Sequence, residues 1–246
     1  MDKTGLRRVT AAVLIGATVA ANAAFFGLGS SFQYPDVLQK PTGEILELFV
    51  ATRSSTMAWF ALLALGAALL APAAVLLSRL YGGRAARLSM WVGVGAAIVQ
   101  VVGLSRWFLL VPGYSARATD ASASAAQRAE AIASFETAHR ILGSLVGETF
   151  GYVLTAGWTV LVVIAIGRAR AGSWFLGLGL LSACLIALGV FVPFGLPGAD
   201  MANLAGYVIW SIWLLVLAGK LLRNAAGATP VDPRLRPLHS TAGGST

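Results

Sequence analysis

Residues 141–166 read ILGSLVGETFGYVLTAGWTVLVVIAI, and this stretch sets the fold class. It exceeds the roughly 20 mostly apolar residues that a helix needs to cross the hydrocarbon core of a membrane. Its one charged side chain is Glu148. A bilayer offers backbone groups no other partner, and the sequence has no alternating barrel pattern. We therefore predict an all-α integral membrane bundle of six transmembrane helices, the other five being Val9–Leu28, Met57–Leu80, Met90–Val111, Trp174–Phe194 and Met201–Leu222.

The amino-acid composition agrees with this class and excludes several others. Of the 246 residues, 57% are apolar and 11% are charged, whereas soluble domains carry about 25% charged residues. The net charge of +8 is not gathered into one patch, so we expect no nucleic-acid partner. One cysteine and two histidines exclude a disulfide framework, a multi-thiolate metal site and a bis-histidine haem. We therefore expect neither a metal nor a cofactor.

The positions of lysine and arginine predict the orientation. If the N-terminus is cytoplasmic, most of the 18 basic residues lie in the inner segments, as the positive-inside rule requires. We predict one domain over residues 1–222 in the cytoplasmic (inner) membrane, both termini inside, and a disordered cytoplasmic tail over residues 223–246. The first span has an alternative interpretation, because Ala21-Asn22-Ala23 imitates the cleavage site of a secretory signal. Its full membrane length favours a retained helix.

The first outer segment, residues 29–56, contains a predicted short helix. Thr42–Glu44 is a helix-start pattern, and Ile45, Leu48 and Phe49 follow on one face. This spacing is typical of an amphipathic helix that lies in the membrane interface.

Two charged side chains are expected deep inside the membrane. Glu148 lies about 10 Å inside the fourth span at 1.5 Å per residue, where a charge costs at least about 2.5–3.5 kcal/mol. Arg106 reaches a comparable depth from the outer end of the third span. We expect the two to pair, or to share a polar cavity with Gln100, Ser105 and Asn203. A structural ion pair that fixes helix register and a substrate or proton site are both open interpretations.

The remaining candidate ligand-binding residues face the same interior or its outer mouth: Asn22, His139, Arg140, Tyr152 and Tyr207. Asn203 and Tyr207 share a helix face by their i, i+4 spacing. An α-helical fourth span places two neighbouring rows on its inner face: His139, Gly143, Gly147 and Gly151, then Arg140, Ser144, Glu148 and Tyr152. The glycines form overlapping Gly-x-x-x-Gly motifs, which predict close packing with another helix or with a helix of a partner.

Three segments resemble a known family. They are FQYPDVL at residues 32–38, the Arg106-Trp107 step, and residues 147–159, which contain Gly-Glu, Gly-Tyr and Leu-Thr-Ala-Gly-Trp-Thr. Together they resemble bacterial six-helix membrane proteins of a domain-of-unknown-function family. The resemblance covers most of the chain and implies the six-helix count, but it implies no activity.

The sequence contains no catalytic motif of a serine hydrolase, zinc protease, P-loop or dinucleotide-binding enzyme, so we lean against an enzyme. The leading hypothesis is a protein that binds, senses or passes a small molecule or lipid in an outward-facing polar pocket, with Arg106 and Glu148 at its floor. One alternative is a membrane-embedded enzyme on a lipid or isoprenoid, with Glu148 as acid/base and Arg106 holding an anionic group. Another is a structural subunit of a membrane complex.

Overall fold

The computed structural model describes residues 2–167 and 171–227, and every regular element within them is helical. In chain order these elements are α1 (Lys3–Phe32), η1 (Asp36–Gln39), α2 (Thr42–Ala51), α3 (Arg53–Ala68), α4 (Leu70–Tyr81), α5 (Gly83–Leu109), α6 (Val111–Ala118), α7 (Ala125–Ala138), η2 (His139–Phe150), α8 (Gly151–Ile166), α10 (Ser173–Leu188), η3 (Gly189–Phe194) and α11 (Ala199–Ala226). Here η2 is a π-helix, while η1 and η3 are 3₁₀-helices.

Six helical stretches are long and apolar enough to cross a membrane: Lys3–Phe32, Arg53–Tyr81, Gly83–Ala118, Ala125–Ile166, Ser173–Phe194 and Ala199–Ala226. The predicted all-α fold with six spans is therefore confirmed. The second stretch is interrupted where α3 ends at Ala68 and α4 begins at Leu70. Pro72 explains this break, because it has no N–H to donate to the carbonyl four residues earlier.

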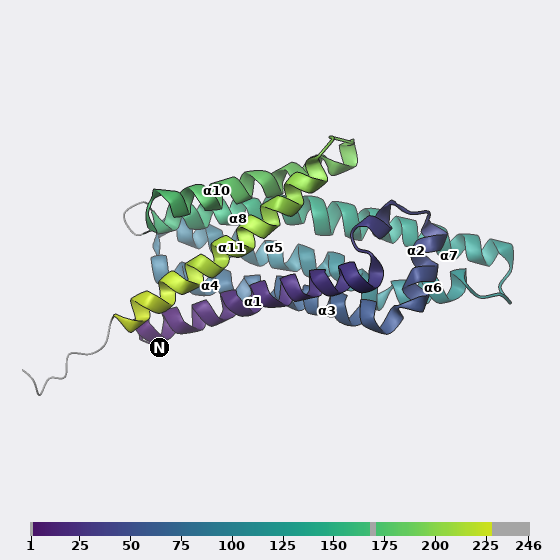
Figure 1. Ribbon diagram of the computed structural model, residues 1–246, viewed down its shortest axis with the longest axis horizontal. Helices are drawn as coiled ribbons and strands as arrows, with labels where there is room; N and C mark the ends of the chain where they lie inside the picture. Colours follow the sequence, from purple (N-terminus) through teal and green to yellow (C-terminus); the bar gives the residue numbers. More distant parts are fainter. Residues whose placement is uncertain (1, 168–170, 228–246) are drawn as a thin grey trace, which may run out of the picture.

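The helices run further than hydropathy alone predicts. Stretches three and four continue through α6 and α7, which lie side by side beyond one end of the bundle (Figure 1). Helix α7 begins at a capping box, in which Ser124 and Gln127 each bond the other's backbone N–H. At the opposite end, α11 continues to Ala226, beyond the predicted start of the tail. The rest of that predicted tail, residues 228–246, lies outside the described residues.

The predicted short helix in the first outer segment is present as α2. Its buried residues are Ile45, Leu46 and Phe49, and the predicted Leu48 is partly buried against the same cluster. This face packs inside the protein, in an aromatic cluster with Phe32. Helix α2 lies across the end of the bundle beside α6 (Figure 1).

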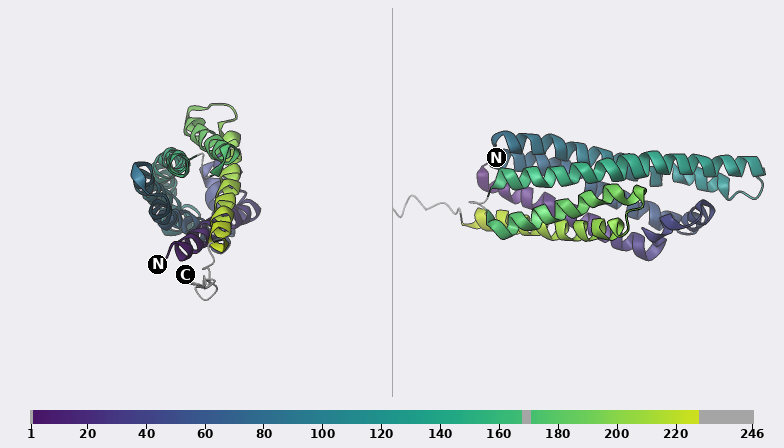
Figure 2. Two further views of the ribbon diagram at one scale, coloured as in Figure 1. Left: turned by 90° about the vertical axis from the view of Figure 1, so that its left-hand side faces the viewer. Right: turned by 90° about the horizontal axis from the view of Figure 1, so that it is seen from above.

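The two largest apolar cores occupy the two ends of the bundle, and a third, smaller cluster contains Ala156, Ala183 and Ile186. One of the two large cores contains Trp158, Phe175 and Trp213 and lies toward the end where α1 begins and α11 finishes. The other contains Phe32 and Trp107. Both ends of the described chain meet at the first core, where the Arg7 guanidinium donates a hydrogen bond to a carbonyl of α11. Figure 2 shows this end of the molecule facing the viewer and the bundle from above.

Candidate functional site

Arg106 is the buried charge at the centre of the site. It lies on the last turns of α5 and is 4% exposed. Its Nη1 donates a hydrogen bond to the carbonyl of Gly103, and its Nη2 lies 3.4 Å from Nδ1 of His139. Its Nε is buried and has no hydrogen-bond partner. Guanidinium stays protonated at any accessible pH, so this position holds a permanent positive charge inside the protein.

Glycines on the fourth span provide the space for this side chain. A Cβ atom on Gly143 would lie 2.7 Å from Nη2 of Arg106. One turn further, a Cβ on Gly103 would lie 2.5 Å from the Cα atom of Gly147, so the two backbones touch directly. A Cβ on Gly151 would lie 3.2 Å from Cγ of Gln100. The predicted glycine ridge thus packs against α5 of its own chain.

The π-helix η2 changes which residues share a face. An α-helix turns by about 100° per residue, so the nine residue steps from His139 to Glu148 would place the two side chains on opposite faces. A π-helix, with i→i+5 bonding and about 4.4 residues per turn, makes about two full turns over the same distance. Both side chains therefore point the same way. Within this helix the Thr149 hydroxyl donates to the carbonyl of Ser144, five residues back. The predicted glycine row at i, i+4 spacing nevertheless faces α5 at Gly143, Gly147 and Gly151.

Glu148 is half-buried on this inner face. Across residues 2–167 and 171–227, its carboxylate makes no hydrogen bond and no ion pair, so the expected direct pairing with Arg106 is absent. The reason is geometric: the guanidinium turns toward the carbonyl of Gly103 and the ring of His139 instead.

Tyr34 joins this group from the segment after α1. The pKa of its hydroxyl is raised to about 12, mainly by burial and in part by the charge of Glu148, while the charge of Arg106 opposes the rise. The three groups therefore lie within electrostatic reach of one another. The Tyr34 ring packs edge-on against Phe60, with 5.4 Å between ring centroids. Tyr34 was not among the predicted site residues, although it lies in the FQYPDVL segment that carries the family resemblance.

A hydrogen-bonded group continues from this site toward the other core. Gln100 donates to the hydroxyl of Thr155 at 3.1 Å, and Thr155 is fully buried. The Tyr207 hydroxyl lies beside the same threonine, and its ring centroid lies 6.0 Å from that of Tyr152. Asn203 donates to the carbonyl of Ile186 at 2.8 Å and so ties α11 to α10. Thr155 was missed because a threonine inside an apolar span gives no signal of its own.

Three sequence candidates do not join the group. Arg140 is exposed. Asn22 donates to the Ser211 hydroxyl at 3.0 Å and connects α1 to α11. Ser105 donates to a carbonyl of its own helix. Gln100, Arg106, His139, Glu148, Tyr152, Asn203 and Tyr207 remain in the interior, although their binding role stays a prediction.

Within residues 2–167 and 171–227, no group of three or more His, Cys, Asp or Glu side chains could hold a metal ion. A shallow cavity of about 500 Å³ lies between α6 and α7 and is lined by Tyr114 and Glu130 among others. A second cavity, of about 430 Å³, lies at the end of the bundle that carries the termini. Neither of these two cavities is lined by Arg106 or Glu148.

Comparison with known proteins gives a family but no activity. No curated protein and no solved structure matches the chain. The model of one family, described as Domain of unknown function (DUF4386), matches residues 9–218. This range includes all six apolar stretches in whole or in large part, and it confirms the resemblance noted in the sequence. The chain is therefore a six-span membrane protein that belongs to the DUF4386 family of unknown function.

Proposed function

We propose that this protein binds a small molecule or lipid at the group formed by Arg106, Glu148 and Tyr34. One observation carries the proposal. A permanently charged guanidinium is 4% exposed, has an Nε without a hydrogen-bond partner, and faces no carboxylate at ion-pair distance among the described residues. A buried charge without a partner is costly in a membrane, and an anionic group of a ligand would remove that cost through charge-assisted hydrogen bonds.

The surrounding geometry supports the same proposal. Glu148 adds an unpaired carboxylate on the same inner face, which can accept a hydrogen bond from a hydroxyl or amine of the ligand. Helix η2 carries both Glu148 and His139, and π-helical turns occur frequently at functional sites. The group lies toward the end of the bundle away from the termini, beside the aromatic core of Phe32 and Trp107. With the termini in the cytoplasm, this end is the outer one.

The test compares two conservative substitutions. Arg106→Lys keeps the charge but removes the planar guanidinium that can hold an anion through two donors. Arg117→Lys makes the same change at an exposed position of α6. Native mass spectrometry of protein extracted from its membrane would count bound small molecules and lipids in the three proteins. We expect a bound species in the wild type and in Arg117→Lys, and its loss in Arg106→Lys. Equal retention in all three would contradict the proposal.

A further inference from the structure

The cavity at the end of the bundle that carries the termini has an unusual lining. It measures about 430 Å³ and lies among α1, α4, α8, α10 and α11. Its cationic wall is formed by Lys3 and Arg7 of α1, Arg79 of α4 and Lys220 of α11. No aspartate or glutamate lines it. Four positive side chains from three helices therefore surround one space.

Two of the four positive charges are held in place by groups other than acids. The Lys220 ammonium lies 5.5 Å from the ring centroid of Trp174 and 5.4 Å from that of Phe175, and it donates to the carbonyl of Ala171 at 3.2 Å. Arg7 donates to the carbonyl of Asn224 at 2.9 Å. The nearest acid in the sequence, Asp2, accepts a hydrogen bond from the Gly5 N–H as the cap of α1. In the described part of the chain, the four cations form no ion pair.

Most of the remaining wall of the cavity is apolar, although Tyr81 and Asn224 also line it. The apolar part includes Leu6, Phe175, Leu217 and Leu221. The cationic wall matches the headgroup of an anionic lipid, and the apolar wall matches the adjoining acyl chain. Basic pockets between helices on the cytoplasmic side of a membrane bind such headgroups.

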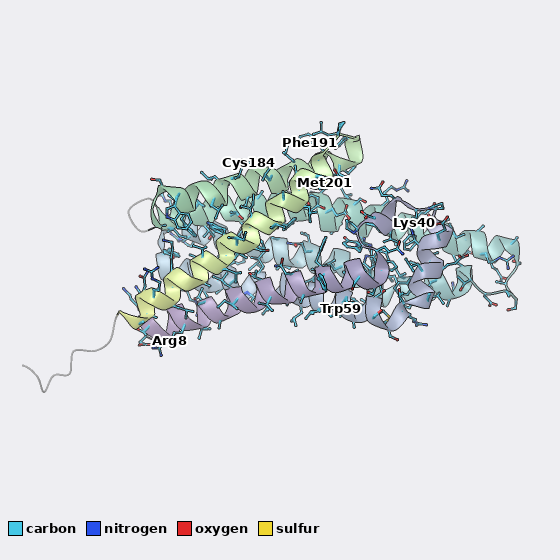
Figure 3. All side chains as sticks on the ribbon, viewed as in Figure 1. Arg8, Lys40, Trp59, Cys184, Phe191 and Met201 are labelled. Carbon is cyan, nitrogen blue, oxygen red and sulfur yellow. The ribbon has the colours of Figure 1, made fainter. Side chains whose placement is uncertain are left out.

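The orientation rule alone does not account for this arrangement. Basic residues are expected on the cytoplasmic side of any membrane protein, and Arg8, Arg84 and Arg87 lie at the same end without lining the cavity. Figure 3 shows Arg8 at this end of the bundle, far from Lys40 at the other. The positive-inside rule requires positive charges in the inner loops. It does not require several of them to line the same cavity. Like charges around one space repel one another, so the convergence points to an anion.

We propose that this cavity binds a phosphate group, carried by an anionic lipid headgroup at the inner surface of the membrane or by a free phosphate. The four cations would surround the phosphate oxygens, with Arg7 and Arg79 as bidentate donors and the two lysines as point charges. This site is separate from the one at Arg106, so either proposal can fail without the other.

The experiment measures ligand-dependent thermal stabilisation of the whole protein in a neutral detergent. The probes are dioctanoyl phosphatidate, inorganic phosphate and, as a zwitterionic control, dioctanoyl phosphatidylcholine. The test variant is Arg7→Gln with Arg79→Gln. The control variant, Arg8→Gln with Arg87→Gln, removes the same charge from exposed positions at the same end of the bundle. Binding is read from the shift of Tm with probe concentration, so a change in basal stability does not affect the comparison.

We expect phosphatidate to raise Tm in the wild type and in the control variant, and its apparent affinity to fall at least about tenfold in the test variant. Stabilisation by phosphatidate at much lower concentrations than by inorganic phosphate assigns the site to a lipid headgroup. Equal potency of the two assigns it to free phosphate. Equal loss in both variants, equal stabilisation by phosphatidylcholine, or no stabilisation of the wild type by either phosphate-bearing probe would overturn the proposal.

Discussion

Replacing Gly103 by alanine tests the close contact between α5 and η2 that positions the candidate site. The new Cβ would lie 2.5 Å from the Cα atom of Gly147 and 2.8 Å from the carbonyl oxygen of Leu142. Both neighbours are backbone atoms, which cannot rotate away, so the two helices must separate. Arg106 lies three residues further along α5, where it donates to the Gly103 carbonyl within its own helix and places Nη2 3.4 Å from Nδ1 of His139 on η2. Separation of the helices would therefore also disturb the buried charge.

The magnitude follows from two opposing terms. Overpacking a tightly packed position costs about 1–3 kcal/mol, and alanine gains up to about 1 kcal/mol over glycine as a helix former. We expect a net loss of about 1–2 kcal/mol, which for a chain of this size lowers Tm by roughly 2–8 °C. Gly147→Ala should lower the free energy of unfolding by less, because its Cβ would lie 3.1 Å from the Cα atom of Gly103.

The assay is thermal unfolding of the purified protein in detergent, followed by tryptophan fluorescence. Gly177→Ala is the matched control, because a Cβ at this position of α10 would meet nothing within 4 Å, and it should leave Tm unchanged or raise it. An unchanged or higher Tm for Gly103→Ala, together with the expected behaviour of Gly177→Ala, would refute the direct backbone contact. The position of Arg106 derived from that contact would then also be wrong.

Three further outcomes are expected. In a Cys184→Ala background, a cysteine at Ala121 should react with a membrane-impermeant maleimide on intact cells, and one at Ala85 only after permeabilisation; the reverse pattern would invert the orientation. Asn203→Ala should lower the free energy of unfolding by about 0.6 kcal/mol, and by no more than about 1.7 kcal/mol, because interhelical hydrogen bonds in membranes have this strength. Trp210→Phe should lose a similar amount, since its indole N–H donates at 2.8 Å to a threonine hydroxyl on α8; no loss in thermal unfolding of either variant would contradict these assignments.

The fold could be predicted from the sequence because each membrane span is a continuous stretch that its length and apolar composition identify. The extensions α6 and α7 could not, since these helices continue past the apolar stretches. Their ends depend on caps and on contacts with one another. The predicted residues of α2 all pack inward, and Leu46 is buried beside them for a physical reason. The helix packs against aromatic rings from other elements, which cover more than one narrow stripe.

The sequence could indicate that Arg106 and Glu148 lie close to one another, but not their contacts. The sequence placed Arg106 and Glu148 in the same zone, because each position could be counted from the end of its span. The side chains that they face depend on the helical period, and the π-helix changes that period over residues 139–150. Glycine-rich sequence at Gly143 and Gly147 indicated close packing without indicating this change. Tyr34 reaches the group only through the turn after α1, which no periodicity describes.

The distinction between a structural ion pair and a binding site now depends on this geometry. A pair that served only to fix helix register would bring the guanidinium and the carboxylate into contact, because each charge alone is costly in a membrane. Instead, glycines at 103 and 143 give Arg106 the room to bond a backbone carbonyl and to approach His139, while Glu148 stays without an ion pair among the described residues. Arg106 and Glu148 carry opposite charges and lie in the same region without forming an ion pair. Each can therefore bind a complementary group of a ligand. This arrangement favours binding over a purely structural role.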